Sequence, residues 1–243
     1  ITIIFAAYFL GSRVMQQVAF NVVDRSGDSH ADIVEVNRLT IAGWAGRDQA
    51  AIEHHIAELA ELGVKRPSTT PCFYRLGAEL LTQAGQIDVV GVKSSGEAEC
   101  VLVRSKAGLL VTVGSDHTDR EVEAYGVTVS KQVCPKPVAR DAWRFDDVAG
   151  HWDQLELRAF AVTGNGERRV YQQGSVASLL PAADLLERAP VAEGAAMFCG
   201  TLAVQGGIVG MVDGDALELE LHDPVLKRTL RHAYRVHALP IVE

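Results

Sequence analysis

Hydrophobic residues in this chain mostly recur in short alternating or continuous runs, a pattern that is typical of β-strands. The first run covers residues 18–23, a turn follows at Gly27-Asp28, and the second run covers residues 33–41, so we expect a hairpin. Further strands are expected at residues 87–92, 99–104, 108–113, 155–162, 168–172, 196–204, 216–222 and 228–236. Strands therefore dominate the predicted structure.

Helical periodicity is clearest between Arg47 and Leu62, and Gly63 follows as a typical C-terminal helix residue. A second short helix is expected within residues 176–188, where Pro181 must either kink it or divide it into a turn and a helix. Few helices among many strands indicate a β-rich α+β fold. Because the sequence has no repeat and no low-complexity linker, we expect a single domain over residues 15–243.

Composition and charge narrow the functional classes. The 243 residues are enough for one large core, and 23 basic against 31 acidic residues give a net charge of −8. An acidic surface repels phosphate backbones, so nucleic acid is not an expected partner. The four cysteines are widely spaced and form no CxxC pair, which favours a reduced cytoplasmic protein over a disulfide scaffold.

The first ten residues, ITIIFAAYFL, are apolar but too few to cross a membrane, which takes about 20 residues. They also lack the basic flank and the small-residue cleavage site of a signal peptide. We therefore expect no membrane partner. We interpret residues 1–14 as a vector-derived or mis-started extension, with a native strand as the alternative.

Acidic residues gather in two segments. Glu97 and Glu99 stand at i and i+2 on an expected strand, so their carboxylates share one face and could hold a hard ion such as Mg²⁺ or Mn²⁺. Taken alone, this spacing is more typical of an exposed strand face. Asp116 follows an apolar run, and a helical turn would place Arg120 on the same side; a solvated turn is the alternative.

Lys131 follows the alternating run VTVS, which we interpret as a strand, and precedes Pro135 and Pro137. The prolines force an extended backbone, from which the lysine could reach back to the acidic segments. An ordinary surface lysine is the alternative.

The order of these features resembles the fumarylacetoacetate hydrolase superfamily, and within it a poorly characterised bacterial branch known as a domain of unknown function. The superfamily has an E-x-E strand, which corresponds to Glu97-Ala98-Glu99, and then an aspartate followed by S/T-x-R, which corresponds to Asp116 with Arg120. Its lysine before prolines corresponds to Lys131. Its H-x-x-E helix corresponds to His55-Ile56-Ala57-Glu58, and its glycine-threonine pair to Gly200-Thr201. A glycine pair and the strand ALELEL then follow in the expected order. Leu202 departs from the superfamily by replacing a proline, and the stretch between Glu99 and Asp116 is short.

The resemblance implies a mixed β-sandwich or roll with few short helices, in which residues 15–45 form an N-terminal hairpin and residues 46–243 the core. It implies that Glu97, Glu99 and Asp116 hold one divalent cation, with Mg²⁺ expected first and Mn²⁺ or Ca²⁺ as alternatives. It also implies a homodimer.

Further residues receive roles from the same resemblance. Arg120 and Lys131 supply positive charge for an anionic oxo acid, while Gly200 and Thr201 contact it. His55, oriented by Glu58, is the base that activates water. Neighbours such as His54 and His55 point about 100° apart on a helix, so at most one of them should face the site, and His55 is favoured because Glu58 stands at i+3. His117 is expected to be structural.

The sequence therefore predicts a metal-dependent hydrolase that cleaves a C–C bond in a small oxo or diketo acid through a metal-stabilised enolate. A decarboxylase, isomerase or hydratase using the same site is the alternative. A non-catalytic small-molecule or metal-binding protein is the alternative of another class.

Overall fold

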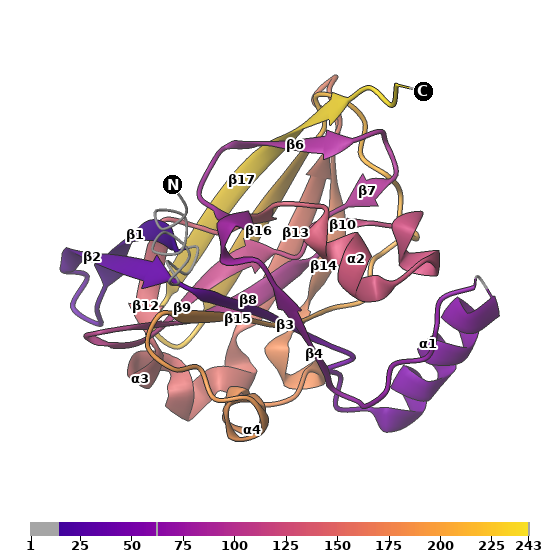
Figure 1. Cartoon of the computed structure of the whole chain (residues 1–243). Coiled ribbons are helices and arrows are strands. Elements are labelled where there is room, and N and C mark those ends of the chain that lie inside the picture. Colours follow the sequence, from indigo (N-terminus) through magenta and orange to yellow (C-terminus); the bar gives the residue numbers. More distant parts are fainter. Residues whose placement is uncertain (1–14, 62, 243) are drawn as a thin grey trace, which may run out of the picture.

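The structure is a computed structural model that describes residues 15–61 and 63–242 (Figure 1). The expectation for residues 1–14 lies outside the described residues. Two large curved sheets pack together and short helices lie around their edges, which confirms the expected β-rich α+β fold.

The larger sheet has eight strands in the order β2-β1-β12-β9-β8-β15-β3-β4. In chain order, these strands are β1 (Gln16–Val23), β2 (Ser29–Val36), β3 (Arg38–Gly43), β4 (Cys72–Leu76), β8 (Ala98–Ser105), β9 (Gly108–Ser115), β12 (Asp141–Arg144) and β15 (Ala195–Thr201).

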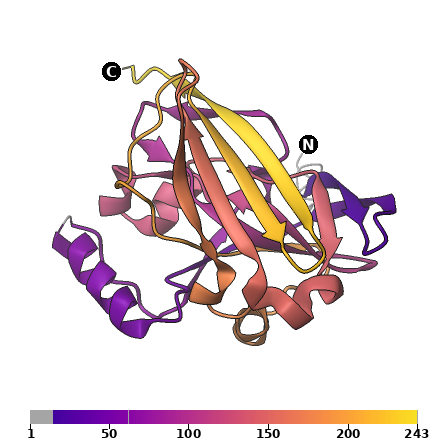
Figure 2. The same ribbon diagram turned by 180° about the vertical axis from the view of Figure 1, so that it is seen from behind.

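The second sheet has five strands in the order β14-β13-β16-β17-β6, and Figure 2 shows it in front. Its strands are β6 (Gln86–Val90), β13 (Glu156–Val162), β14 (Arg168–Ser175), β16 (Ala216–Asp223) and β17 (Arg228–Leu239). Two short pairs complete the strands of the described chain: β7 (Ser94–Ser95) with β10 (Thr118–Asp119), and β5 (Leu81–Thr82) with β11 (Lys136–Pro137).

The α-helices are α1 (Gln49–Glu61), α2 (Val127–Gln132), α3 (Phe145–Val148) and α4 (Ala182–Arg188). Single 3₁₀ turns cover Ala78–Leu80, Val122–Ala124 and Val176–Ser178, and a kinked 3₁₀ stretch covers Ala149–Gln154. None of the helices in the described residues is long and apolar enough to cross a membrane.

Strand β8 lies at the centre of the molecule and is buried on both faces. Cys100 and Leu102 on one face join the core between the two sheets, whereas Val101 and Val103 on the other face join a second cluster with strands β1 to β3. Because side chains alternate across a strand, both cores require apolar residues at successive positions. This explains the continuous apolar run of residues 100–103 that follows Glu99 in β8.

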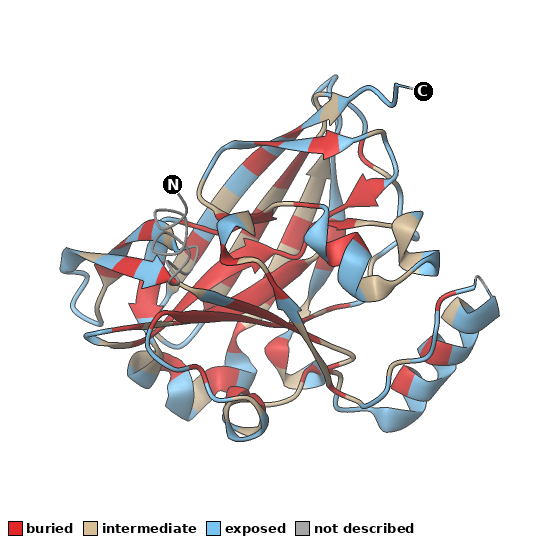
Figure 3. Ribbon diagram, in the orientation of Figure 1, coloured by how far each residue is buried: buried red, intermediate tan, exposed pale blue. Residues whose placement is uncertain are grey.

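The expected helices form. Helix α1 ends at the predicted place, with Gly63 at φ +86° and its N–H donating to the Ala60 carbonyl at 3.1 Å. Pro181 separates the turn at Val176–Ser178 from helix α4, so the divided version of the second helix is confirmed. Most of α1 is exposed (Figure 3).

Three local expectations are wrong. Residues 33–41 form two strands that part at Asn37, because β2 pairs with β1 while β3 runs between β15 and β4. Lys131 lies in helix α2, since the run VTVS is too short for its alternation to exclude a helical turn. Asp116 and Arg120 flank the extended pair Thr118–Asp119, so no helical turn joins them.

Candidate metal centre and its cavity

Three carboxylates converge where strands β8 and β9 meet. Glu97 immediately precedes β8, Glu99 is the second residue of that strand, and Asp116 follows β9. The antiparallel register pairs Ala98 with Ser115, and the Asp116 N–H donates to the Glu97 carbonyl at 2.9 Å. One oxygen from each carboxylate then lies within 4.8 Å of the others.

The Glu99 carboxylate is buried beside two other acids. Burial, followed by the charges of Asp116 and Glu97, raises its pKa well above the ordinary value. Its Oε2 accepts a hydrogen bond of 2.7 Å from the Gly200 N–H. Clustered buried carboxylates of this kind are unfavourable without positive charge between them.

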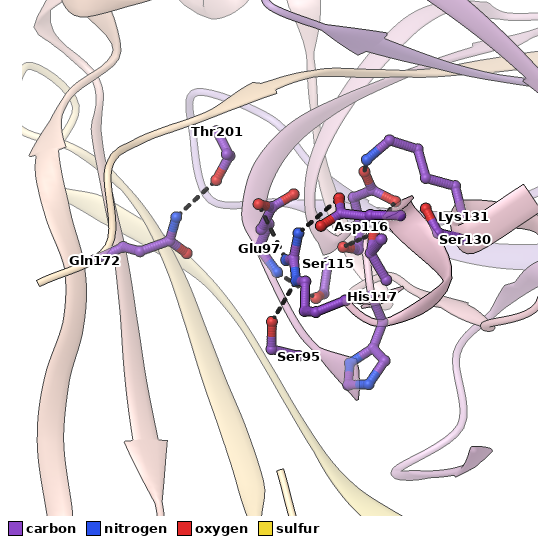
Figure 4. A network of polar contacts seen from close by, with 12 residues as sticks. Ser95, Glu97, Ser115, Asp116, His117, Ser130, Lys131, Gln172 and Thr201 are labelled. Atoms are coloured by element: carbon purple, nitrogen blue, oxygen red, sulfur yellow. Dashed lines mark hydrogen bonds and ion pairs between the residues drawn. The ribbon is translucent and has the colours of Figure 1, made fainter. Parts of the chain in front are cut away.

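Two buried lysines accompany Asp116. Lys131 Nζ is 2.5 Å from Asp116 Oδ2, and Lys136 Nζ is 3.4 Å from Asp116 Oδ1 (Figure 4 shows Lys131). Burial alone would raise the pKa of Asp116, but the two ammonium groups hold it below its ordinary value. Asp116 is therefore a carboxylate that stays ionised.

Lys136 was missed by the sequence analysis. Its ammonium donates to the backbone carbonyls of His117, Lys131 and Cys134, at 2.5, 2.5 and 3.0 Å respectively. These bonds tie the turn after β9 to the end of helix α2. The only signal in the sequence was a lysine between two prolines just before the buried Val138.

Arg120 serves the opposite side of the cluster. Its Nη2 is 3.1 Å from Glu97 Oε1, its Nη1 is 3.1 Å from Glu123 Oε1, and its Nε donates to Ser95 Oγ at 2.7 Å (Figure 4 shows Ser95 and Glu97). Arg120 Nη2 is buried and makes no hydrogen bond of acceptable geometry within the described residues. Arg120 therefore places a positive charge directly beside Glu97 at this side of the cluster.

These residues fit a divalent cation. The donors are carboxylate oxygens only, which are the ligands of hard ions such as Mg²⁺, Mn²⁺ and Ca²⁺. Glu99 has no cationic side chain within 4.0 Å among the described residues, so a bound cation would relieve its repulsion by Glu97 and Asp116.

Gly200 and Thr201, which the resemblance expects to contact the substrate, lie beside the carboxylates. Gly200 has φ +95°, and a Cβ there would lie 2.8 Å from Ala45 Cβ, so glycine is required for this close approach. Thr201 Oγ1 donates to the Ala98 carbonyl at 2.8 Å and accepts from Gln172 Nε2 at 2.7 Å (Figure 4).

Gln172 connects the two sheets, a role that sequence reasoning did not assign. Its Oε1 accepts from the Ala98 N–H at 2.8 Å, and its Nε2 also donates to the Leu202 carbonyl at 2.6 Å. The buried amide thereby ties the backbone between Glu97 and Glu99 to the segment at the end of β15.

A cavity of about 710 Å³ opens in front of the carboxylates. The carboxylates and their two cations line one end, and helix α1 lines the other with His54, His55 and Glu58. His54 Nε2 is 3.2 Å from Glu58 Oε1 and His55 Nδ1 is 3.4 Å from Glu58 Oε2, so both histidines border the cavity and share one carboxylate. No ion pair or hydrogen bond joins them to Glu97, Glu99 or Asp116 in the described residues.

His117 points away from the carboxylates. Its ring nitrogens contact Tyr234 Oη and Ser94 Oγ, each at 2.9 Å. Burial, with smaller contributions from Lys136 and Arg120, lowers its pKa to about 3. The ring is therefore neutral and joins the two sheets.

Comparisons with known proteins agree with this architecture. A sequence-family model described as "Protein of unknown function (DUF2848)" matches residues 42–234. No curated protein matches the chain.

Several solved structures share the fold at low identity. A 2-keto-3-deoxy-D-arabinonate dehydratase complexed with magnesium and 2,5-dioxopentanoate has a TM-score of 0.61 and 16% identity over 87% of this chain and 77% of that one. Maleylpyruvate hydrolase from Sphingobium sp. SYK-6 has a TM-score of 0.56 and 13% identity over 86% of this chain and 75% of that one. A candidate isomerase from Escherichia coli has a TM-score of 0.59 and 16% identity over 89% of this chain and 99% of that one.

Proposed function

Because the chain belongs to the DUF2848 family and has the fold of the fumarylacetoacetate hydrolase superfamily, we propose that it is a divalent-metal-dependent hydrolase of C–C bonds in oxo acids. The observation that carries this proposal is the convergence of Glu97, Glu99 and Asp116 at one end of a cavity that also contains cationic side chains. The cation is Mg²⁺ by preference, as in the magnesium complex of the dehydratase that shares the fold.

The head of the substrate, an oxo group beside a carboxylate, binds at the acidic end. A divalent cation held by Glu97, Glu99 and Asp116 supplies Lewis-acid stabilisation of negative charge on the head oxygens. Arg120 and Lys131, which both line this end of the cavity, contribute the positive charge that attracts the substrate carboxylate.

His55 is the base that takes a proton from water. Because Glu58 contacts His55 Nδ1 at 3.4 Å, Nε2 is left to accept that proton. The water oxygen bonds to the acyl carbon and the adjacent C–C bond breaks. The electron pair of the broken C–C bond stays on the oxo-acid fragment. That fragment is then protonated by His55, which returns the proton that it took from water.

The other reactions proposed for this site are decarboxylation, isomerisation and hydration or dehydration, and two structures sharing the fold are a dehydratase and a candidate isomerase. A binding protein without catalysis is the remaining class. Hydrolysis is favoured because a histidine–carboxylate pair borders the same cavity as the carboxylates.

The test is turnover of acetylpyruvate, oxaloacetate and longer diketo acids by the purified protein with Mg²⁺ or Mn²⁺, with both products identified by mass spectrometry. We expect hydrolysis that EDTA abolishes and added metal restores. His55→Gln should lower kcat about 10²-fold or more, as loss of a general base does. His30→Gln, at an exposed histidine of strand β2, is the matched control.

Full activity of His55→Gln would eliminate the assigned base. Products other than a carboxylic acid and an oxo acid would replace hydrolysis by one of the alternative reactions. We also propose that the chain is a cytoplasmic homodimer. Light scattering of the purified protein tests the oligomeric state.

A further inference from the structure

The cavity is much larger than an oxo-acid head. Its volume of about 710 Å³ lies in the range of about 300–1,000 Å³ that proteins use for drug-sized ligands. A head of six heavy atoms would displace only a few waters, each occupying about 30 Å³ in the liquid. The rest of the volume therefore accommodates another part of the ligand.

The walls of this remaining volume are mainly apolar. Helix α1 contributes Ile52 and Leu59, and the segment after β15 contributes Leu202, Val204 and Ile208. Ile208 is 47% exposed, although no charged group of the segment after β15 borders the cavity. An apolar ligand group placed here would remove its own surface and that of these side chains from water.

Trp44 also lines the cavity and lies next to His55. It has a positive φ of 60°, which is unfavourable for a residue other than glycine, and its Nε1–H donates to Tyr74 Oη at 2.9 Å. The indole ring lies 5.7 Å from the His55 ring, centroid to centroid. A strained and anchored aromatic side chain that borders a cavity is typical of a ligand contact.

Charge along the cavity is asymmetric. Arg120 and Lys131, the cations among its described lining residues, both pair with the carboxylates of the metal centre. The opposite end carries Asp48 and Glu58, and Glu58 already contacts both histidines. A second carboxylate on the ligand would meet acidic side chains there and no free cation.

We propose that the substrate is a monoanionic oxo acid whose acyl end is a neutral apolar group, such as a medium-length alkyl chain or an aromatic ring, and that Trp44 determines this specificity. The proposal rests on the function proposed above. This specificity differs from that of an enzyme for short or dicarboxylic oxo acids. A short oxo acid would leave the apolar volume empty, and a dicarboxylic one would place a charge in it.

Binding of uncleavable probes tests the proposal directly. Oxamate, N-hexyloxamate and N-(5-carboxypentyl)oxamate share one head and differ in the tail, and their Kd values on Mn²⁺-loaded protein are measured by calorimetry. Burial of one methylene strengthens binding about fourfold, so even partial burial of the hexyl chain should give a gain of at least about tenfold over oxamate. The terminal carboxylate of the third probe should remove most of that gain.

Trp44→Ala should lower the affinity ratio of N-hexyloxamate to oxamate several-fold, and Trp44→Phe should restore part of it. Ile33→Ala truncates a side chain that is 62% exposed on strand β2, outside this cavity, and should leave the ratio unchanged. In turnover, kcat/KM for hexanoylpyruvate should exceed that for acetylpyruvate and for oxaloacetate.

The outcomes separate the two proposals. If acetylpyruvate or oxaloacetate is cleaved as efficiently as hexanoylpyruvate and oxamate binds as tightly as its hexyl derivative, the apolar tail is wrong while the hydrolase stands. If Trp44→Ala keeps the full ratio, Trp44 is not the specificity residue. If no oxo acid is cleaved and no oxamate binds, both proposals are overturned.

Discussion

Two carboxylates of one cluster should have opposite effects on the stability of the metal-free protein. Asp116→Asn and Glu99→Gln each replace a carboxyl group by a neutral amide and keep the shape of the side chain. We expect the first substitution to destabilise the fold strongly and the second to leave it unchanged or stabilise it. The reason is that the two carboxylates have different neighbours.

Asp116 is paired with two buried ammonium groups, Lys131 at 2.5 Å and Lys136 at 3.4 Å. Removing its charge leaves both cations without their carboxylate in a buried site. Breaking a buried ion pair costs about 3–5 kcal/mol, so the free energy of unfolding should fall by about that amount. Replacing Asp116 should therefore impair the fold as well as metal binding.

Glu99 has acidic neighbours and no ion pair within 4.0 Å among the described residues. The pKa of Glu99 in the folded protein is raised above the pKa of an ordinary glutamate. Its contribution to stability is therefore fully present at pH values below the ordinary pKa, and it is lost as the pH rises through the pKa of the folded protein. At pH 7, well above the ordinary pKa of a glutamate, holding Glu99 in this buried acidic cluster costs stability, and the neutral amide of the Glu99→Gln variant removes that cost. The amide oxygen can still accept from the Gly200 N–H.

Urea unfolding at pH 7 with EDTA, followed by tryptophan fluorescence, measures both effects. Glu121→Gln, at an exposed carboxylate in the same region, is the control and should change the free energy of unfolding by less than about 0.5 kcal/mol. Repeating the titration with Mn²⁺ at 100 times its Kd should stabilise the wild type by about 2.7 kcal/mol and both variants by much less. If Glu99→Gln destabilises the metal-free protein as much as Asp116→Asn does, the reasoning about this cluster is refuted.

Two further predictions concern residues around the site. The pKa of His117, lowered to about 3 by burial, means that its neutral ring stabilises the fold fully above about pH 6.5, and this stability is lost at about 1.4 kcal/mol per pH unit as the pH falls toward 3. Urea unfolding at pH 7, 6 and 5 should show a smaller acid loss for His117→Gln than for wild type; parallel profiles would contradict the prediction. Gly200→Ala should cost about 2–4 kcal/mol, because φ is +95° and the new Cβ would lie 2.8 Å from Ala45 Cβ. Gly85→Ala, where no atom lies within 4 Å of the new Cβ, is its control in the same thermal and urea assays, and equal losses would exclude the steric argument.

Local periodicity was sufficient for much of the fold. The spacing of apolar residues predicted helix α1 and its end at Gly63, and it predicted the position of most long strands. These features depend on neighbours within a few residues, which the sequence displays directly. Where a run was short, as in VTVS before Lys131, the same pattern suited two structures and the expectation was wrong.

The sequence also determined that Glu97 and Glu99 share one face of a strand, and the order of motifs related Asp116, Arg120 and Lys131 to them. Only the tertiary structure decided how these residues meet. The register of β8 against β9 brings Asp116 to Glu97, and helix α2 directs Lys131 to Asp116. The contacts of Lys136 and Gln172 join segments up to 74 residues apart. Such contacts depend on which buried polar groups need partners after the sheets have packed, and local sequence patterns do not encode that requirement.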